Sequence, residues 1–320
     1  MKRIFALLLF AQFINSCDDG DLTVETLNFD SVAVQRCSNG NVLYKLGTNE
    51  ALIIEIPAAT ALMNEPTPVG MPLSYSIDNS NRVIYRSYNG AVSSESICGT
   101  IPPASPAVTA EWIATSGTIE ITTTAVLADN PALPGGQRIT GYKHTITFRN
   151  INFVKPDGEQ LYETFNFGDY TSTVTPLPFN FDGTLEKCAA GNLIFDYVGT
   201  QALTLIIDQN LLQSSVTPPG EPRTGLLGTT QNVLTYTLFA SGPLTSDYFC
   251  TIPTPATPAI AETWTGVDGV EGVSGIVEVT TTTSGSAFLH EIHLKNVTLK
   301  KGNSSFLLAT DYLFGQLLTE

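Results

Sequence analysis

The sequence contains little charge, and most of that charge is acidic. Only 14% of its 320 residues are Asp, Glu, Lys or Arg, and 30 acidic residues stand against 15 basic ones, for a formal net charge of -15. Such a surface repels phosphate backbones and offers no basic stripe, so we expect no nucleic-acid partner. We interpret the acidity as a contribution to solubility rather than as a binding code.

The sequence also lacks the short motifs of several enzyme classes. It has no Gly-x-Ser-x-Gly elbow, His-Glu-x-x-His zinc motif, P-loop or dinucleotide glycine fingerprint, and no two of its cysteines have Cys-x-x-Cys spacing. Histidine occurs only three times, at His144, His290 and His293. We therefore expect no metal, no cofactor and no catalytic activity, with a hydrolase built on a His/Glu site kept as an alternative.

No apolar run approaches the roughly 20 residues that a membrane-spanning helix requires. The apolar run at residues 4–11 follows the charged pair Lys2-Arg3 and precedes a short polar stretch and Cys17. A charged start followed by a short apolar segment is typical of a secretory signal peptide, which we place at residues 1–16. The rest of the chain should then be exported to a compartment that permits disulfides.

Residues 14–17 (Ile-Asn-Ser-Cys) resemble the lipobox of bacterial lipoproteins, although Asn15 departs from the small residue usual there. Residues 18–21 (Asp-Asp-Gly-Asp) resemble the acidic tether of lipoproteins from the Bacteroidetes group. The resemblance implies acylation of Cys17, a tether at 17–21 and anchoring to the outer membrane through the lipid, on its periplasmic or cell-surface face. A chance cysteine after an ordinary signal peptide, and a plain solvated spacer, are the alternatives.

The remainder of the chain contains an internal repeat. Residues 36–44 and 187–195 share a cation, a cysteine, a glycine, an asparagine and three apolar residues in register, and residues 144–151 match 290–297. The shift of 151 residues between Cys37 and Cys188 is too long for a solenoid or propeller unit. We predict two tandem homologous domains, at residues 22–172 and 173–320.

The repeat also selects a disulfide pairing. Apart from Cys17 there are four cysteines, and each copy carries one early and one middle cysteine. Four cysteines allow three connectivities. The economical one stays within the copies and pairs Cys37 with Cys98 and Cys188 with Cys250, which leaves Cys17 as the cysteine without a partner.

Composition and periodicity predict an all-β fold. Thr, Val, Ile, Gly and Pro are abundant, and short runs of apolar alternation are separated by Gly, Pro, Asn and Asp clusters. This pattern predicts an antiparallel β-sandwich, or a squat barrel, in each copy. At most a helical turn or two is expected, around residues 108–112. The order Cys37, Cys98, Trp112 excludes the immunoglobulin pattern, whose tryptophan lies between the two cysteines.

Three pairs of equivalent residues are candidate ligand contacts. They are His144 with His290, Glu120 with Glu278, and Trp112 with Trp264. Each pair also has a structural interpretation, namely a shared strand residue, a solvated sheet face and a buried core residue. Our first hypothesis is a non-enzymatic envelope lipoprotein that binds or scaffolds an unknown protein or glycan, and the alternative is a surface carbohydrate-binding or adhesive protein.

Overall fold

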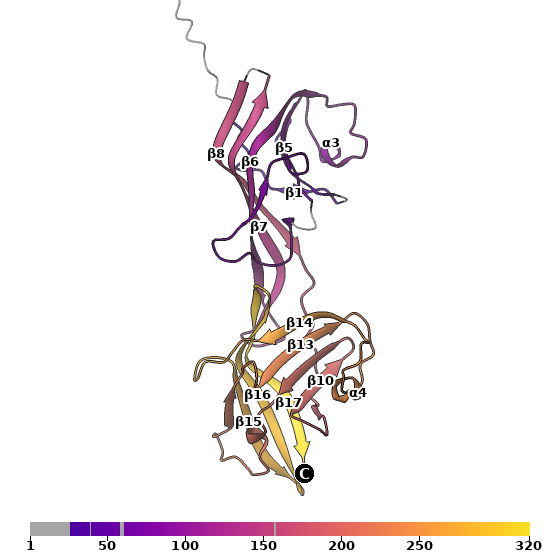
Figure 1. The fold of residues 1–320 in the computed structure, drawn as a ribbon, viewed down its shortest axis with the longest axis vertical. Helices are drawn as coiled ribbons and strands as arrows, with labels where there is room; N and C mark the ends of the chain where they lie inside the picture. Colours follow the sequence, from indigo (N-terminus) through magenta and orange to yellow (C-terminus); the bar gives the residue numbers. More distant parts are fainter. Residues whose placement is uncertain (1–25, 39, 58–60, 157) are drawn as a thin grey trace, which may run out of the picture.

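The computed structural model describes residues 26–38, 40–57, 61–156 and 158–320. The signal peptide, Cys17 and the tether therefore lie outside the described residues. The described chain is nearly all β and forms two antiparallel sheets, one in each copy of the sequence repeat (Figure 1). We call these copies repeat 1 and repeat 2.

Repeat 1 is an eight-stranded sheet of order β1-β2-β3-β5-β6-β7-β8, with β4 paired to β6. Its elements are β1 (Gln35–Arg36), β2 (Val42–Leu46), β3 (Glu50–Glu55), β4 (Leu73–Ser76), β5 (Arg82–Tyr88), α3 (Glu95–Cys98), β6 (Val108–Asp129), β7 (Gln137–Lys155) and β8 (Gly158–Thr173). Strand β6 pairs with β5 through its first half and with β4 through its second half. One long strand therefore belongs to both layers of the sandwich.

Repeat 2 is a nine-stranded sheet of order β12-β15-β16-β14-β13-β11-β10-β9, with β17 paired to β16. Its elements are β9 (Glu186–Lys187), β10 (Leu193–Val198), β11 (Gln201–Ile206), η1 (Gln209–Leu212), β12 (Arg223–Leu226), β13 (Val233–Phe239), α4 (Ser246–Cys250), β14 (Ile260–Gly266), β15 (Ile276–Ser284), β16 (Ala287–Lys301) and β17 (Ser304–Thr319). The predicted fold class, two tandem antiparallel β-sandwich domains, is confirmed.

The sheet of repeat 1 bends where β6 passes through Gly117. Gly117 has φ +120°, and a Cβ atom there would lie 2.7 Å from the Cα of Ile151. The facing strand contributes Asn150 at φ 49°, and the pairing register shifts on both sides of this corner. Repeat 2 places Gly275 (φ +64°) and Asn296 (φ 49°) at the matching positions. Glycine adopts such angles most readily and asparagine does so at some cost, and both copies place these two residue types at the same point of the repeat.

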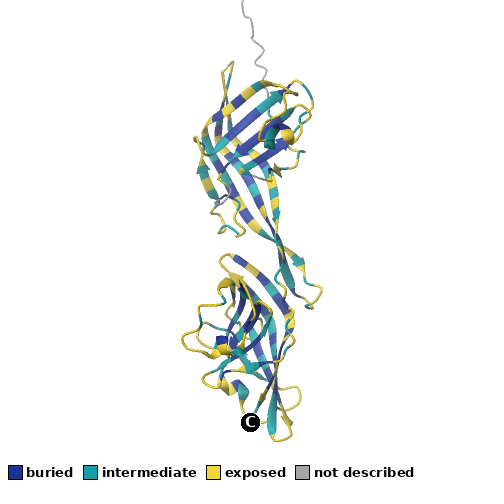
Figure 2. Ribbon diagram, turned by 90° about the vertical axis from the view of Figure 1, so that its right-hand side faces the viewer, coloured by how far each residue is buried: buried dark blue, intermediate teal, exposed yellow. Residues whose placement is uncertain are grey.

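Alternation along the strands places the core between the layers. In β6, Ile119, Ile121 and Thr123 are buried, whereas the residues between them face outward. Figure 2 shows buried residues alternating with more exposed ones along the strands of both repeats, the pattern expected when one face of each strand is turned to the core. The expected helical turn at residues 108–112 is wrong, because these residues begin β6. The short helices are instead α3 and α4, which end at the second cysteine of each repeat.

Both predicted disulfides are present. Cys37 is bonded to Cys98 and Cys188 to Cys250, with sequence separations of 61 and 62 residues. Each bond ties the short helix to the sheet of its own repeat. No helix within the described parts of the chain is long and apolar enough to span a membrane.

The β6–β7 hairpin of repeat 1 reaches into repeat 2 (Figure 1). It is longer than its counterpart, since 21 residues separate Thr123 from His144 but only 9 separate Thr281 from His290. Ile139 and Tyr142, near the end of the extended hairpin, belong to the hydrophobic core of repeat 2.

Polar contacts fix the extended hairpin against β17. The hydroxyl of Tyr142 lies 3.0 Å from Oγ of Ser304, and the Thr310 amide donates to the Pro134 carbonyl at 3.2 Å. Gly136 lies so close that a Cβ atom there would clash with the Leu308 carbonyl oxygen. The extended hairpin, with its 12 additional residues, is therefore one of the contacts that join the two repeats, and hydrogen bonds from Asn303 to Glu65 and Pro66 are another.

Candidate functional site

A pocket of about 230 Å³ lies at this junction. Four parts of the chain line it: Asn64 in the segment between β3 and β4, the extended hairpin, the linker after β8, and strands β14, β16 and β17 of repeat 2. Its apolar wall consists of Ile139, Tyr142, Leu177, Phe179, Trp264 and Phe306. A concave apolar site with a few polar groups at its rim is the usual form of a small-molecule site, so we take this inter-repeat pocket as the candidate functional site.

An ion pair between Glu262 and Lys301 lies at the polar rim of the pocket. Glu262 accepts a hydrogen bond from Nε1 of Trp264 at 3.1 Å and pairs with Lys301. The Lys301 ammonium in turn lies 5.3 Å from the Trp264 ring centroid. These three groups satisfy one another and hold the indole in place.

Arg138 is the rim residue with hydrogen-bonding capacity to spare. Its Nε atom is buried and hydrogen-bonds to no atom of the described residues. An arginine can only donate, so the group that fits beside it is an acceptor such as a carboxylate. The pocket thus combines an apolar body with one unsatisfied cationic donor.

The tryptophans are buried residues rather than an exposed platform. Trp112 and Trp264 are 4% and 3% exposed. Trp112 packs against Tyr85, with ring centroids 4.5 Å apart, and is covered by Lys155 at 4.9 Å. Both indoles are therefore core residues, and Trp264 alone also lines the inter-repeat pocket.

The two equivalent histidines are fully buried, and each hydrogen-bonds through both ring nitrogens to neighbouring strands. In repeat 2, the Thr281 hydroxyl oxygen accepts a hydrogen bond from Arg223 at 2.8 Å. The Thr281 hydroxyl then donates its own proton to Nδ1 of His290, also at 2.8 Å. Nε2 then carries the ring proton and faces Oγ1 of Thr319 at 2.9 Å. Hydrogen bonds on both nitrogens assign a neutral Nε2–H tautomer to His290.

His144 has the same arrangement in repeat 1. Its Nδ1 faces Oγ1 of Thr123 at 2.9 Å and its Nε2 faces Oγ of Ser172 at 3.3 Å. Ser172 donates its own proton to Oδ1 of Asn64 at 2.9 Å, so it accepts from the histidine. Burial lowers the pKa of His144 to about 4, with a smaller contribution from Arg36, and burial lowers the pKa of His290 as well. Neither ring offers a free lone pair to a substrate, which does not favour general-base chemistry.

Glu120 and Glu278 occupy the outer faces of the sheets, in ion pairs. Glu120 accepts from Nε of Arg149 at 2.9 Å, and Glu278 lies 3.5 Å from Nζ of Lys295. Exposed pairs of this kind contribute little to stability. Glu120 and Glu278 lie on the solvated face of the sheet, as predicted from the alternation of polar and apolar residues along their strands.

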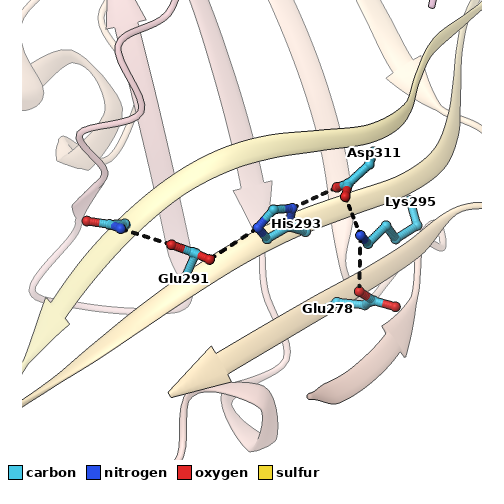
Figure 3. Close-up of polar contacts among 6 residues, drawn as sticks. Glu278, Glu291, His293, Lys295 and Asp311 are labelled. Atoms are coloured by element: carbon cyan, nitrogen blue, oxygen red, sulfur yellow. Dashed lines mark hydrogen bonds and ion pairs between the residues drawn. The ribbon is translucent and has the colours of Figure 1, made fainter. Parts of the chain in front are cut away.

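Around Glu278 a longer polar chain crosses three strands of repeat 2 (Figure 3). It runs from Lys295 to Asp311 at 2.5 Å, from Asp311 to Nδ1 of His293 at 2.7 Å, and from Nε2 of His293 to Glu291 at 3.3 Å. Burial alone would raise the pKa of Asp311, but hydrogen bonds from Lys295 and His293 lower it. Every side chain in this chain contacts at least one other polar side chain, so we interpret it as a surface network that ties β15, β16 and β17 together.

No group of three or more His, Cys, Asp or Glu residues in the described part of the chain is placed to hold a metal ion. Of the six candidate ligand contacts, the structure brings only Trp264 to the inter-repeat pocket. Sequence reasoning missed Arg138, Ile139 and Leu177. The unequal spacing of the Thr and His positions in the two copies could have pointed to Arg138 and Ile139, whereas no sequence signal marks Leu177, which lies in the linker after β8.

The fold and site define a protein of two tandem β-sandwich domains with a partly apolar pocket where the two repeats meet. Comparisons with protein-family models, with curated proteins and with solved structures found no match.

Proposed function

We propose that this protein is a non-catalytic binding module of the cell envelope, tethered to the outer membrane through an acylated Cys17. The observation that carries the binding role is the inter-repeat pocket, whose wall needs both repeats and the linker between them. Its ligand is a small molecule with an apolar body and an acceptor group for Arg138. The neutral, hydrogen-bonded histidines and the paired carboxylates support a binding role over catalysis.

The pocket is tested with 2-naphthoate, a flat apolar body that carries a carboxylate, by isothermal titration calorimetry on the mature protein. We expect saturable binding with a Kd in the millimolar range or tighter. Arg138→Gln should weaken 2-naphthoate binding about tenfold, because it removes a charge-assisted hydrogen bond. Binding of the uncharged 2-naphthamide should change little in the same variant.

Two further variants complete the test of the pocket. Arg149→Gln removes an arginine that pairs with Glu120 on the outer sheet face, and it should leave 2-naphthoate binding unchanged. Val174→Trp places a large ring in the pocket and should abolish binding of both probes. Equal affinities in wild type and Val174→Trp would remove the inter-repeat pocket as the binding site.

The anchor is tested by metabolic labelling with radiolabelled palmitate. The wild type should incorporate label, whereas Cys17→Ala should not, because the thiol is the acylation site. Asn15→Ala, which restores the small residue usual in a lipobox, serves as the matched control and should label at least as well as wild type. Label in Cys17→Ala at the wild-type level would contradict the anchoring proposal.

A further inference from the structure

A second hollow, of about 420 Å³, lies in repeat 1 away from the inter-repeat pocket. It is bounded by the end of β5, the start of β6, helix α3 and the proline-rich segment that joins α3 to β6. Pro102, Pro103 and Pro106 contribute walls of apolar ring. We call it the proline hollow.

Two buried hydroxyl groups line the proline hollow. Tyr88 and Ser96 are 4% and 5% exposed. Oγ of Ser96 hydrogen-bonds to no atom of the described residues, whereas the Tyr88 hydroxyl interacts with the Arg86 guanidinium and helps to raise its pKa. Buried hydroxyls are normally hydrogen-bonded, because an unpaired one loses its water without replacement. Both residues line the same space, so a polar molecule within it would give the Ser96 hydroxyl the partner that it lacks.

In repeat 2, aromatic side chains of the protein occupy the positions equivalent to Tyr88 and Ser96. Tyr88 and Phe239 are the equivalent last residues of β5 and β13, and Ser96 and Tyr248 each stand two residues before the second cysteine of their repeat. In repeat 2 the Phe239 and Tyr248 rings pack edge to face, with centroids 5.2 Å apart. In repeat 1, the small residue Ser96 therefore replaces the Tyr248 ring. Tyr88 replaces Phe239 and adds a hydroxyl group at the edge of the ring.

The charged side chains of the hollow also differ between the two repeats. Arg86 and Glu111 form a pair at 2.6 Å, whereas the equivalent paired residues of repeat 2 are Thr237 and Thr263. Burial alone would lower the pKa of Arg86, but Glu111 and Tyr88 raise it. The pair brings several donors and acceptors to the hollow without a net charge, which disfavours an ionic ligand.

We propose that the proline hollow of repeat 1 binds a single neutral pyranose sugar. A pyranose presents adjacent hydroxyls that both donate and accept, which match Tyr88, Ser96 and the Arg86–Glu111 pair. Its C–H faces suit the apolar proline walls, and its lack of charge suits the neutral lining. The site is separate from the inter-repeat pocket and does not depend on the function proposed for it.

The test is a titration of the mature protein with methyl glycosides of glucose, galactose and N-acetylglucosamine, followed by NMR. We expect saturable binding of at least one of them at concentrations on the order of 10 mM or below. Ser96→Tyr reproduces the residue of repeat 2, fills the hollow and should abolish binding. Tyr88→Phe removes one hydroxyl and should weaken binding about three- to tenfold.

Controls separate loss of the site from loss of the fold. Tyr44→Phe removes a buried hydroxyl of the same repeat that bonds Gln35 outside the hollow, and it should bind the sugar as wild type does. Ser96→Tyr should keep its cooperative melting and its binding of 2-naphthoate. The proposal is overturned if no glycoside binds saturably, if glucuronate binds more tightly than every neutral glycoside, or if Ser96→Tyr binds the sugar as wild type does.

Discussion

Replacing both Cys188 and Cys250 with alanine is expected to lower the free energy of unfolding of repeat 2 by about 4 kcal/mol. The bond closes a loop of 62 residues, and a cross-link of that length removes about this much conformational freedom from the unfolded chain. It also ties helix α4 to the sheet where Phe249 stacks on Phe195, with centroids 4.6 Å apart. Urea unfolding of the wild type and the double variant, at equal protein concentration, measures the difference.

The equivalent double variant of Cys37 and Cys98 is the matched comparison. Its loop of 61 residues gives the same entropic contribution, so a difference between the two double variants reports packing around the helices rather than chain entropy. A loss below about 1 kcal/mol in both would mean that the unfolded state is already compact and that the cross-links constrain it little.

Acid should destabilise the protein through its buried histidines. Because burial lowers the folded-state pKa of His144 from 6.5 to about 4, the unfolded state binds a proton more readily between these values. The contribution of His144 to stability is therefore complete above about pH 6.5 and is lost as the pH falls towards 4. Between pH 7 and pH 5 the expected loss is about 2 kcal/mol, and His290 changes stability in the same direction.

Urea unfolding at several pH values between 7 and 5 measures this effect. His144→Gln lacks the titrating ring, so its stability should fall less steeply over that range, although it will be less stable at pH 7. A profile that is flat from pH 7 to pH 5 in the wild type would show that the rings are not held neutral in the folded state.

The sequence predicted the features that depend on local pattern and on duplication. Alternation along residues 118–126 and 144–154 predicted strands, and these segments lie within β6 and β7. The recurrence of Cys37 and Cys98 at Cys188 and Cys250 selected the disulfides, because a pairing within each copy is the one that two equivalent domains can share. The histidines matched in sequence, and they match again in their Thr partners.

Features that depend on packing between distant segments could not be predicted. Gly117 marks an interruption in the alternation, but nothing local shows that the strand continues through it into a second layer. The inter-repeat pocket draws Ile139, Leu177 and Phe306 from a hairpin, a linker and a strand that are far apart in the chain. Their proximity follows from how the hairpin docks, which periodicity does not encode.

The extended hairpin makes the two repeats unequal, because only repeat 1 extends a hairpin into the other repeat. Repeat 1 ends in the long β6–β7 hairpin that enters its neighbour, whereas the matching hairpin of repeat 2 turns within a few residues between Ser284 and Ala287. A third copy added after the C-terminus would therefore find no arm to receive it. Synthesis from the N-terminus also completes the arm before the surface that buries Ile139 and Tyr142 exists, so the junction cannot form until the strands of repeat 2 have been made.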